Sequence, residues 1–333
     1  MSRIIVLGSG AWGTAIALSL HRRGGHEISL WAHSPDVVEM LQTRRVNEIY
    51  LPGFELPAGI EVTGAYEKAL AAAEIVLGVM PSAHAREMYR AMRPHLEPHA
   101  VFVSATKGLE PATHVRISEV IAAEIVQDPH PRIAVLSGPS FAVEVARGNP
   151  TVVVLASADA SIAAEMQKEF SGPTFRLYTN DDVIGTEIAG AVKNVIAIAA
   201  GVCTGLGLGT NATAALVTRG LAEMTRLAVA LGGRRDTIAG LAGVGDLILT
   251  STGALSRNRF VGIELGKGRE LREILGATRM VAEGIGTTAA TLELARRAGI
   301  EMPITEQVQA VLTAGRVTRD AIRELMERRL KQE

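Results

Sequence analysis

The amino-acid sequence predicts two domains: an α/β domain built on a doubly wound, mostly parallel sheet, followed by an all-α domain. Over the first half of the chain, short apolar runs alternate with helical patterns, which is typical of a parallel sheet covered by helices. From Asp181 onward, nearly every segment has a helical pattern. Because a chain of 333 residues exceeds the usual size of one core, we place the domains at residues 1–185 and 186–333.

The composition is that of an ordinary globular protein, with 47% hydrophobic and 21% charged residues. The 34 Lys and Arg residues nearly balance the 35 Asp and Glu residues, so no overall field favours nucleic acid or an anionic membrane. The single cysteine, Cys203, excludes an intrachain disulfide and a cysteine-based zinc site. No apolar run has the length of a signal-peptide core or a membrane span. We therefore expect a cytoplasmic protein without stable membrane insertion.

The first strand, expected at residues 3–7, leads directly into a glycine motif. Gly8, Gly10 and Gly13 form the pattern G-x-G-x-x-G, and an amphipathic helix follows to about Arg23. In this pattern the first glycine allows a tight turn, the second lets a pyrophosphate approach the backbone, and the third lets helix and strand pack closely. Free N–H groups at the helix N-terminus then bind the phosphates. The motif therefore predicts a Rossmann-type dinucleotide site.

The second strand, expected at residues 27–31, bears on the choice of cofactor. NAD-specific sites place an acidic residue about 20 positions past the glycines, where it binds the adenine ribose. This chain instead has Ala32-His33-Ser34 and reaches its first acid only at Asp36. We therefore expect NADP(H), with NAD(H) left open as an alternative. His33 is the candidate contact to the cofactor, the alternative being that it only begins a loop.

Further strands are expected at residues 74–79, 100–103, 132–136 and 151–155, with helices near 82–92, 113–126 and 139–147. Ligands of such sheets bind beyond the carboxyl ends of the strands. Three of these ends lead into polar or glycine-rich turns, at residues 79–82, 104–108 and 137–142. Lys107, in the second turn, is a candidate ligand-binding cation. The alternative is a solvated loop lysine.

The second half is expected to be helical at residues 183–203, 212–231, 256–266, 286–298, 304–314 and 318–330, and a glycine-rich piece at 241–250 interrupts this run. The first of these helices contains Lys193 and Asn194 within an otherwise apolar, alanine-rich pattern. A cation in such surroundings is costly unless it has a partner or a function. Lys193 is therefore the leading catalytic candidate, on a helix that we expect to be the hinge between the domains.

Seven short motifs lie along residues 8–284 of the chain. They are Gly8-x-Gly-x-Trp-Gly-Thr, Thr106-Lys-Gly, Ser137-Gly-Pro-Ser-Phe-Ala142, Glu187-Ile-Ala-Gly-Ala-Val-Lys-Asn194, Gly245-Asp-Leu, Ser256-Arg-Asn258 and Val281-Ala-Glu-Gly284. Together, and in this order, they resemble the motifs of the bacterial NAD(P)-dependent sn-glycerol-3-phosphate dehydrogenases. Two departures are small: family members often have serine at Ala11 and cysteine at Ser251.

The resemblance implies hydride transfer between a nicotinamide and C2 of glycerol 3-phosphate, with dihydroxyacetone phosphate as the ketone. In this family the activity supplies glycerol 3-phosphate for phospholipid synthesis. On the same basis, the substrate is lined by Lys107, Gly138, Ser140, Lys193, Asp246, Ser256, Arg257 and Asn258. The cofactor is contacted, beyond the three glycines, by Ala11, Trp12, His33, Lys107, Ala142, Arg257, Val281 and Glu283.

Such a reaction needs a group that gives a proton to the ketone and takes it back from the alcohol. Lys193 can do both, and the resemblance gives the matching lysine as proton acceptor in alcohol oxidation. A lysine at its ordinary pKa of about 10.4 is a ready acid but a poor base. Lys107 or Arg257 nearby would lower the pKa of Lys193, whereas Asp246 would raise it. The alternative is a structural Lys193 that pairs with Glu187 or Asp246 to fix the domains.

The segment Ser256-Arg257-Asn258 is the expected phosphate clamp, because arginine supplies a fixed fork of donors. The alternative is an ordinary N-cap serine followed by surface residues. The eight histidines show no metal-binding spacing, so we expect no metal. A helical domain of this size also favours a homodimer.

Two rival functions stay open from the sequence. One is a related enzyme of the same layout that acts on another small hydroxy acid, which Lys107 and the Ser256-Arg257-Asn258 segment disfavour because they match a phosphate. The other is a non-catalytic nucleotide sensor, which would have no use for a proton donor beside a phosphate clamp.

Overall fold

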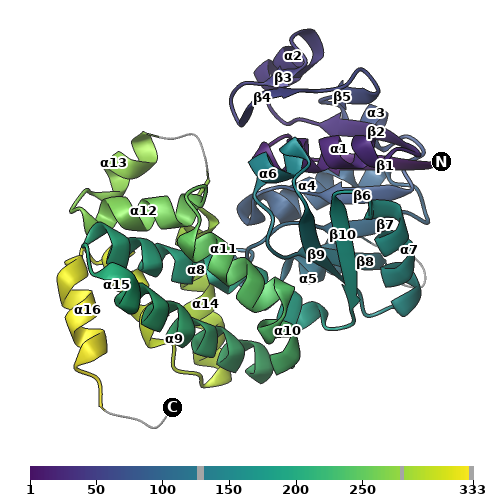
Figure 1. Ribbon diagram of the computed structural model, residues 1–333. Coiled ribbons are helices and arrows are strands. Elements are labelled where there is room, and N and C mark those ends of the chain that lie inside the picture. The colour runs from purple at the N-terminus through teal and green to yellow at the C-terminus, as the bar shows by residue number, and fades with distance from the viewer. Residues whose placement is uncertain (126–130, 278–280, 330–333) are drawn as a thin grey trace.

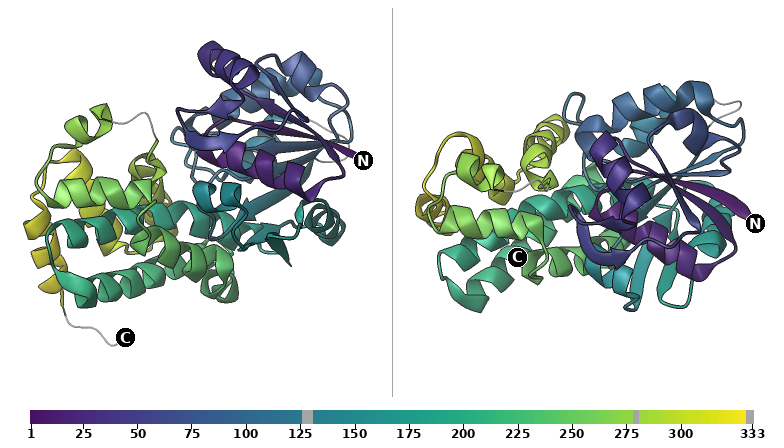
Figure 2. Two further views of the ribbon diagram at one scale, coloured as in Figure 1. Left: turned by 45° about the horizontal axis from the view of Figure 1, so that its top comes forward. Right: turned by 90° about the horizontal axis from the view of Figure 1, so that it is seen from above.

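The computed structural model describes residues 1–125, 131–277 and 281–329. A sheet domain and a helical domain lie side by side in all views (Figures 1 and 2). Helix α8 (Val183–Gly205) begins directly after the last strand of the sheet and runs into the helical domain. The predicted fold class, a doubly wound α/β domain followed by an all-α domain, is confirmed.

The main sheet, as far as the described residues show, has eight strands in the order β10-β9-β8-β7-β6-β1-β2-β5. Neighbouring strands are parallel except for the antiparallel pair β8 and β9, so the sheet is mostly parallel as predicted. The strands are β1 (Ser2–Leu7), β2 (His26–Trp31), β5 (Ile60–Thr63), β6 (Ile75–Gly78), β7 (Val101–Ser104), β8 (Arg132–Ser137), β9 (Thr151–Ala156) and β10 (Phe175–Asn180).

Four strands were not predicted: the two edge strands β5 and β10, and the small antiparallel pair β3 (Val46–Asn47) and β4 (Leu51–Glu55). The edge strands lack the continuous apolar run of a central strand. In β10, for example, Phe175 and Leu177 are buried while Arg176 and Tyr178 are exposed. Strand β4 contains Pro52 and Gly53, which are depleted in strands. Short, half-exposed strands therefore lack the apolar runs that predict a strand.

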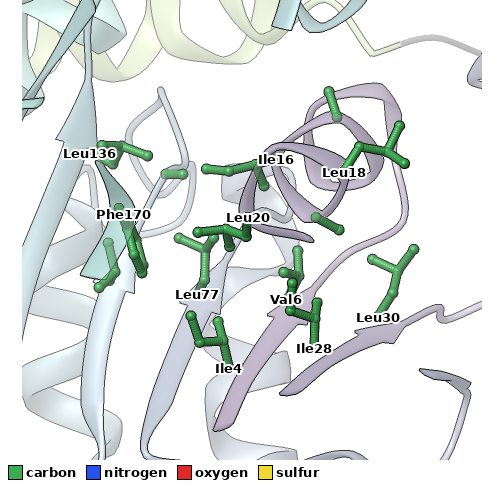
Figure 3. Close-up of a cluster of buried hydrophobic side chains, with 14 of the residues drawn as sticks. Ile4, Val6, Ile16, Leu18, Leu20, Ile28, Leu30, Leu77, Leu136 and Phe170 are labelled. Carbon is green, nitrogen blue, oxygen red and sulfur yellow. The ribbon is translucent and has the colours of Figure 1, made fainter. Parts of the chain in front are cut away.

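Helices cover both faces of the sheet. Successive side chains of a strand point to opposite faces, so a strand that is apolar throughout needs cover on both sides. In β1, Ile4 and Val6 join a core cluster with Ile16 of α1 (Figure 3), whereas Ile5 and Leu7 join a second cluster with Tyr89 of α4. The helical elements of this domain are α1 (Ala11–Arg23), α2 (Pro35–Thr43), α3 (Tyr66–Leu70), η1 (Ser82–His84), α4 (Ala85–Met92), η2 (Arg93–His95), α5 (Ile117–Glu124), α6 (Ala142–Arg147) and α7 (Ala160–Phe170).

The second domain is built around α8, of which residues 185–203 are all buried. Its other elements are α9 (Gly209–Ala230), α10 (Arg235–Ala239), the π-helical turn η3 (Leu241–Gly245), α11 (Asp246–Thr252), α12 (Arg257–Gly266), α13 (Leu271–Gly276), α14 (Glu283–Ala298), α15 (Pro303–Thr313) and α16 (Thr318–Met326). The predicted interruption at 241–250 is wrong, because η3 continues directly into α11. The predicted helix ends at residues 126 and 330 lie outside the described residues.

Helix α8 is long and apolar enough by composition to cross a membrane, and in the described part of the chain it is the one helix that meets this test. However, 89% of its apolar window is buried inside the protein, against α9, α11, α12 and α14. It is therefore the core helix of the second domain, and Lys193 lies within this buried stretch.

Candidate active site

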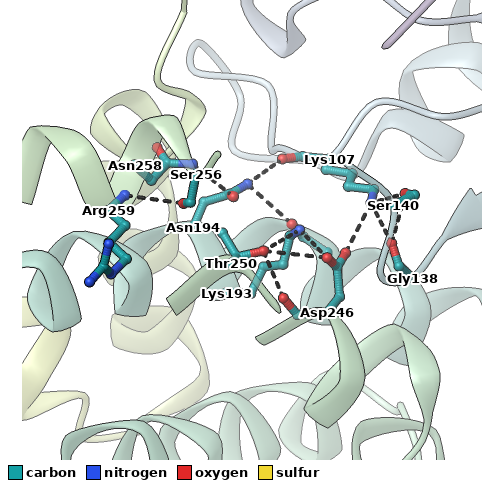
Figure 4. Close-up of polar contacts among 11 residues, drawn as sticks. Lys107, Gly138, Ser140, Lys193, Asn194, Asp246, Thr250, Ser256, Asn258 and Arg259 are labelled. Atoms are coloured by element: carbon teal, nitrogen blue, oxygen red, sulfur yellow. Dashed lines mark hydrogen bonds and ion pairs between the residues drawn. The ribbon is translucent and has the colours of Figure 1, made fainter. Parts of the chain in front are cut away.

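Polar groups from both domains meet beyond the carboxyl ends of β7 and β8 (Figure 4). Lys107 follows β7, and its Nζ donates to the carbonyl oxygen of Gly138 at 2.7 Å and to Ser140 Oγ at 3.2 Å, both in the turn after β8. The same Nζ lies 3.0 Å from Oδ2 of Asp246 on α11. Lys107 therefore links two strand ends of the sheet domain to the helical domain, and it is not a solvated loop lysine.

Lys193 lies on the other side of the same carboxylate. Its Nζ is 2.5 Å from Oδ1 of Asp246 and donates to Thr250 Oγ1 at 2.9 Å. Thr250 is one turn beyond Asp246 on α11 and donates to its backbone carbonyl at 2.7 Å. Lys193 is 5% exposed and Asp246 is 1% exposed. Two lysines therefore share one buried carboxylate, and Glu187 is not the partner of Lys193.

This arrangement changes the proton affinity of Lys193. Burial lowers the pKa of Lys193 from 10.5 to about 7, with Asp246 opposing this shift and Lys107 adding to it. Burial of Asp246 favours its neutral form, but the two adjacent ammonium groups outweigh that effect and keep the pKa of Asp246 below its ordinary value. The sequence anticipated the opposing effects of Lys107 and Asp246, whereas the largest cause is the burial of Lys193 itself. An amine with a pKa near 7 can both give and take a proton at neutral pH.

A chain of amides connects the site to the helices behind it. Asn194 Nδ2 donates to the backbone carbonyl of Lys107 at 3.0 Å, and its Oδ1 accepts a bond of 2.9 Å from Asn258 Nδ2. Asn258 Oδ1 in turn accepts from the backbone N–H of Gly284 at 3.0 Å. The amide of Asn258 is thus occupied in joining α8, α12 and α14.

The three residues of the expected phosphate clamp lie at the start of α12. Ser256 is the N-cap, and its Oγ accepts from the backbone N–H of Arg259 at 3.2 Å. Arg257 is exposed, and within the described ranges its guanidinium makes no hydrogen bond. It faces the carboxylate of Glu283, which interacts with it electrostatically. Among the three, Arg257 is the residue with a full set of free donors.

The glycine loop after β1 leaves room for a ligand at one of its three glycines. A Cβ at Gly8, where φ is +120°, would lie 2.6 Å from the carbonyl oxygen of Val79, and one at Gly13 would lie 1.7 Å from that of Gly8. A Cβ at Gly10 would meet no atom within 4 Å. Gly8 and Gly13 are thus needed for the turn and for packing, while Gly10 leaves open space beside the N-terminus of α1. This geometry fits a bound pyrophosphate.

The other expected cofactor residues surround this loop. Ala11 is the first residue of α1 and Ala142 the first of α6. The Trp12 ring is 6.0 Å from Lys107 Nζ, and exposed His33 lines a hollow of about 350 Å³ at the end of β2. Val281 is half exposed, and Glu283, the first residue of α14, accepts from Ser82 Oγ at 2.7 Å. These residues therefore lie on both domains.

Comparisons with known proteins agree with this layout. The family model described as NAD-dependent glycerol-3-phosphate dehydrogenase N-terminus matches residues 3–163, and the model of the C-terminus matches residues 182–323. The chain belongs to the NAD-dependent glycerol-3-phosphate dehydrogenase family. The resemblance inferred from the seven motifs is thereby confirmed.

Individual members of this glycerol-3-phosphate dehydrogenase family match over nearly their whole length. A protein of Koribacter versatilis named glycerol-3-phosphate dehydrogenase (NAD(P)+) is 56% identical, with 98% of both chains covered. One of Geobacter sulfurreducens with the same name is 49% identical over 99% of this chain and 98% of its own. The crystal structure of glycerol-3-phosphate dehydrogenase from Coxiella burnetii superposes with a TM-score of 0.94 at 41% identity, covering 98% of this chain and 99% of that one.

Two groups of this candidate site were not predicted from the sequence. Thr250 was not predicted because the expected interruption at 241–250 hid the helical spacing that places it one turn from Asp246. Ser82, which donates to Glu283, lies in a polar turn that carries no motif pointing to this role. As for metals, the described residues hold no group of three or more His, Cys, Asp or Glu side chains placed to bind an ion.

Proposed function

We propose that this chain interconverts dihydroxyacetone phosphate and sn-glycerol 3-phosphate, with NAD(P)(H) as the redox partner. The observation that carries the proposal is Lys193: a buried amine with a pKa of about 7, held beside Asp246 where the two domains meet. When bound, the nicotinamide supplies or accepts the hydride at C2 of the substrate. The protein must then supply or accept one proton at the C2 oxygen.

Lys193 is proposed as that proton donor and acceptor. In ketone reduction its ammonium gives a proton to the carbonyl oxygen as negative charge develops there, and in alcohol oxidation the neutral amine takes the proton back. Asp246 and Thr250 hold the Nζ atom in place. Lys107, as a second cation beside Asp246, favours the deprotonated amine after transfer.

The substrate phosphate is proposed to bind Arg257 at the start of α12. Its exposed guanidinium has free donors, and arginine binds phosphate through a planar fork. Ser256 and Asn258 would contribute mainly by shaping this helix end, since their side chains already cap α12 and join it to α8 and α14. Gly138 and Ser140 would line the substrate from the turn after β8, where they hold Lys107.

NADP(H) is proposed as the preferred cofactor, with NAD(H) also accepted. The residues directly after β2 carry no carboxylate that would repel the 2′-phosphate of NADP(H), and His33 there is exposed. The first acid after β2 is Asp36, whose carboxylate accepts a bond of 2.9 Å from Ser34 Oγ. We also propose that the two domains comprise residues 1–185 and 186–333 and that the protein forms a homodimer. Its proposed location is the cytoplasm, without stable membrane insertion, and its proposed role is to supply glycerol 3-phosphate for phospholipid synthesis.

The proposal is tested by following NADPH and NADH oxidation spectrophotometrically with dihydroxyacetone phosphate and with unphosphorylated dihydroxyacetone. We expect rapid oxidation with the phosphorylated ketone and a kcat/KM lower by orders of magnitude without the phosphate. Equal rates with both ketones would remove the phosphate site from the account. No oxidation with either one would overturn the proposed function.

A further inference from the structure

Glu187 is a buried carboxylate that the proposed reaction does not use. It lies on α8, six residues before Lys193, and is only 6% exposed. A buried carboxylate is costly unless it is paired and hydrogen-bonded. Glu187 finds its partners outside its own domain, on the chain that leads from Lys107 to α5.

The bonds of Glu187 occupy both of its oxygens. Its Oε1 accepts from the backbone N–H of Ser118 at 2.8 Å, and its Oε2 accepts from Arg116 Nη1 at 2.9 Å and from Ser118 Oγ. Ser118 lies in the first turn of α5, where backbone N–H groups have no partner within the helix. A residue of the helical domain thus caps a helix of the sheet domain.

The chain between Lys107 and α5 is folded back on itself. Leu109 and Arg116 form an antiparallel bridge, and the backbone N–H of Glu110 donates to the carbonyl of Val115 at 3.0 Å. This loop, residues 105–116, therefore has two arms, with Lys107 on one and Arg116 on the other. A shift of one arm is transmitted to the other through the bridge.

Helix α8 holds both arms. Asn194 Nδ2 binds the backbone carbonyl of Lys107 at 3.0 Å, and Glu187 binds Arg116 and Ser118. The two residues are seven positions apart, which is about two turns or roughly 10 Å along a helix. Because the helix is continuous from Val183 to Gly205, these two attachments fix the loop relative to Lys193, which lies between them.

We propose that Glu187 is a positioning residue: by binding Arg116 and Ser118, it fixes the 105–116 loop on α8 and so holds the Lys107 ammonium against Asp246, opposite Lys193. This inference rests on the proposed function. The groups that face Lys193 are Asp246 and Thr250 of α11 and Lys107 of the loop. Lys107 lowers the proton affinity of Lys193 by repulsion. When its position is loosened, Lys193 binds its proton more tightly.

The test compares Glu187→Gln with Glu223→Gln in the full-length chain. An amide has a single acceptor oxygen, so Gln at position 187 loses the bonds on one side of the original carboxylate. Glu223 of α9 is a matched control, since it is a buried carboxylate that caps the start of another helix, α15. It accepts from the backbone N–H groups of Ile304 at 2.6 Å and Thr305 at 3.3 Å, within the helical domain. Both variants replace one buried carboxylate with an amide.

The measurements are kcat for reduction of dihydroxyacetone phosphate, the pH at which that kcat falls, and the melting temperature. For Glu187→Gln we expect kcat to drop about tenfold, because small misplacements of catalytic groups are costly, and the fall with pH to move to higher pH. Glu223→Gln should keep both at the wild-type values, even where its melting temperature drops as much. Ser118→Ala, which removes one of the bonds, should shift both quantities in the same direction by less, and it replaces Glu187→Gln if that variant does not fold.

Wild-type values of kcat and of the pH dependence in Glu187→Gln, or in Ser118→Ala where that variant is used instead, would overturn the inference. Equal losses in Glu223→Gln would overturn it as well. A wild-type chain that does not reduce dihydroxyacetone phosphate would overturn the proposed function itself. The two failures are therefore distinguishable.

Discussion

Lys193 Nζ lies 2.5 Å from Oδ1 of Asp246, and both side chains are buried where the two domains meet. The other oxygen of this carboxylate is 3.0 Å from Lys107 Nζ. One negative charge thus serves two positive ones, so the pair cannot be described as a simple ion pair. Burial brings the pKa of Lys193 down to about 7, with Asp246 opposing this shift and Lys107 adding to it. That value lies within the range where a proton can be transferred in both directions.

The first prediction concerns pH. Ketone reduction needs the ammonium form of Lys193, which predominates below a pKa of about 7. We expect kcat for reduction to fall about tenfold per pH unit above that value, and kcat for alcohol oxidation to fall similarly below it. Measurement of kcat at saturating substrate checks both directions when it covers about two pH units on either side of this pKa. A reduction rate that is flat across neutrality would contradict the assignment.

The second prediction concerns Asp246→Asn. Because the carboxylate of Asp246 raises the pKa of Lys193, its loss should move the fall of the reduction rate to lower pH. It should also destabilise the fold by about 3–5 kcal/mol, since two buried or half-buried lysines lose their partner. Asp182→Asn is the control. Asp182 is the buried N-cap of α8, and its two oxygens accept from the backbone N–H groups of Gly185 at 2.7 Å and Arg234 at 2.8 Å. Asn has one acceptor oxygen and loses one of these bonds, so the variant should lower stability and leave the pH dependence unchanged.

The third prediction concerns Arg257→Ala, which should raise KM for dihydroxyacetone phosphate about 10- to 100-fold, since each hydrogen bond to a charged group contributes about 1.5–3 kcal/mol. With unphosphorylated dihydroxyacetone, kcat/KM should not change. Arg257→Lys keeps the charge but loses the planar fork, so an intermediate KM is expected. Initial-rate kinetics on both ketones measure these effects. An unchanged KM in Arg257→Ala would remove Arg257 from the phosphate site.

The fourth prediction concerns the close contact of α8 and α12, which sets the distance between Lys193 and Arg257. A Cβ at Gly262 would lie 2.0 Å from the carbonyl oxygen of Ile198. Gly262→Ala should therefore separate the helices and lower the free energy of unfolding by about 1–3 kcal/mol in urea titrations. Gly286→Ala, in the interior of α14 with no atom within 4 Å of the added Cβ, should instead raise it by about 0.5–1 kcal/mol. Equal effects at both sites would contradict the packing argument.

The sequence was most informative where chemistry and local pattern conflict. Lys193 was recognised because a cation interrupts an apolar helix, and Lys107 because it follows a strand whose carboxyl end faces the ligand side. The sharing of Asp246 could not be predicted, because it depends on distances between residues 139 and 53 positions apart in the chain. The edge strand β10 was not predicted because only alternate residues at its start are buried, so it has no continuous apolar run.

The central claim is that Lys193 transfers the proton, and Lys193→Ala tests it most directly. The rate of a single turnover with NADPH and dihydroxyacetone phosphate, followed by stopped flow, should fall by about 10²–10⁴, while NADPH binding, followed by fluorescence titration, stays at the wild-type level. The control Lys68→Ala removes an exposed lysine paired with Glu61 and should leave both quantities unchanged. A Lys193→Ala variant that reduces dihydroxyacetone phosphate at a near-normal rate would contradict the account.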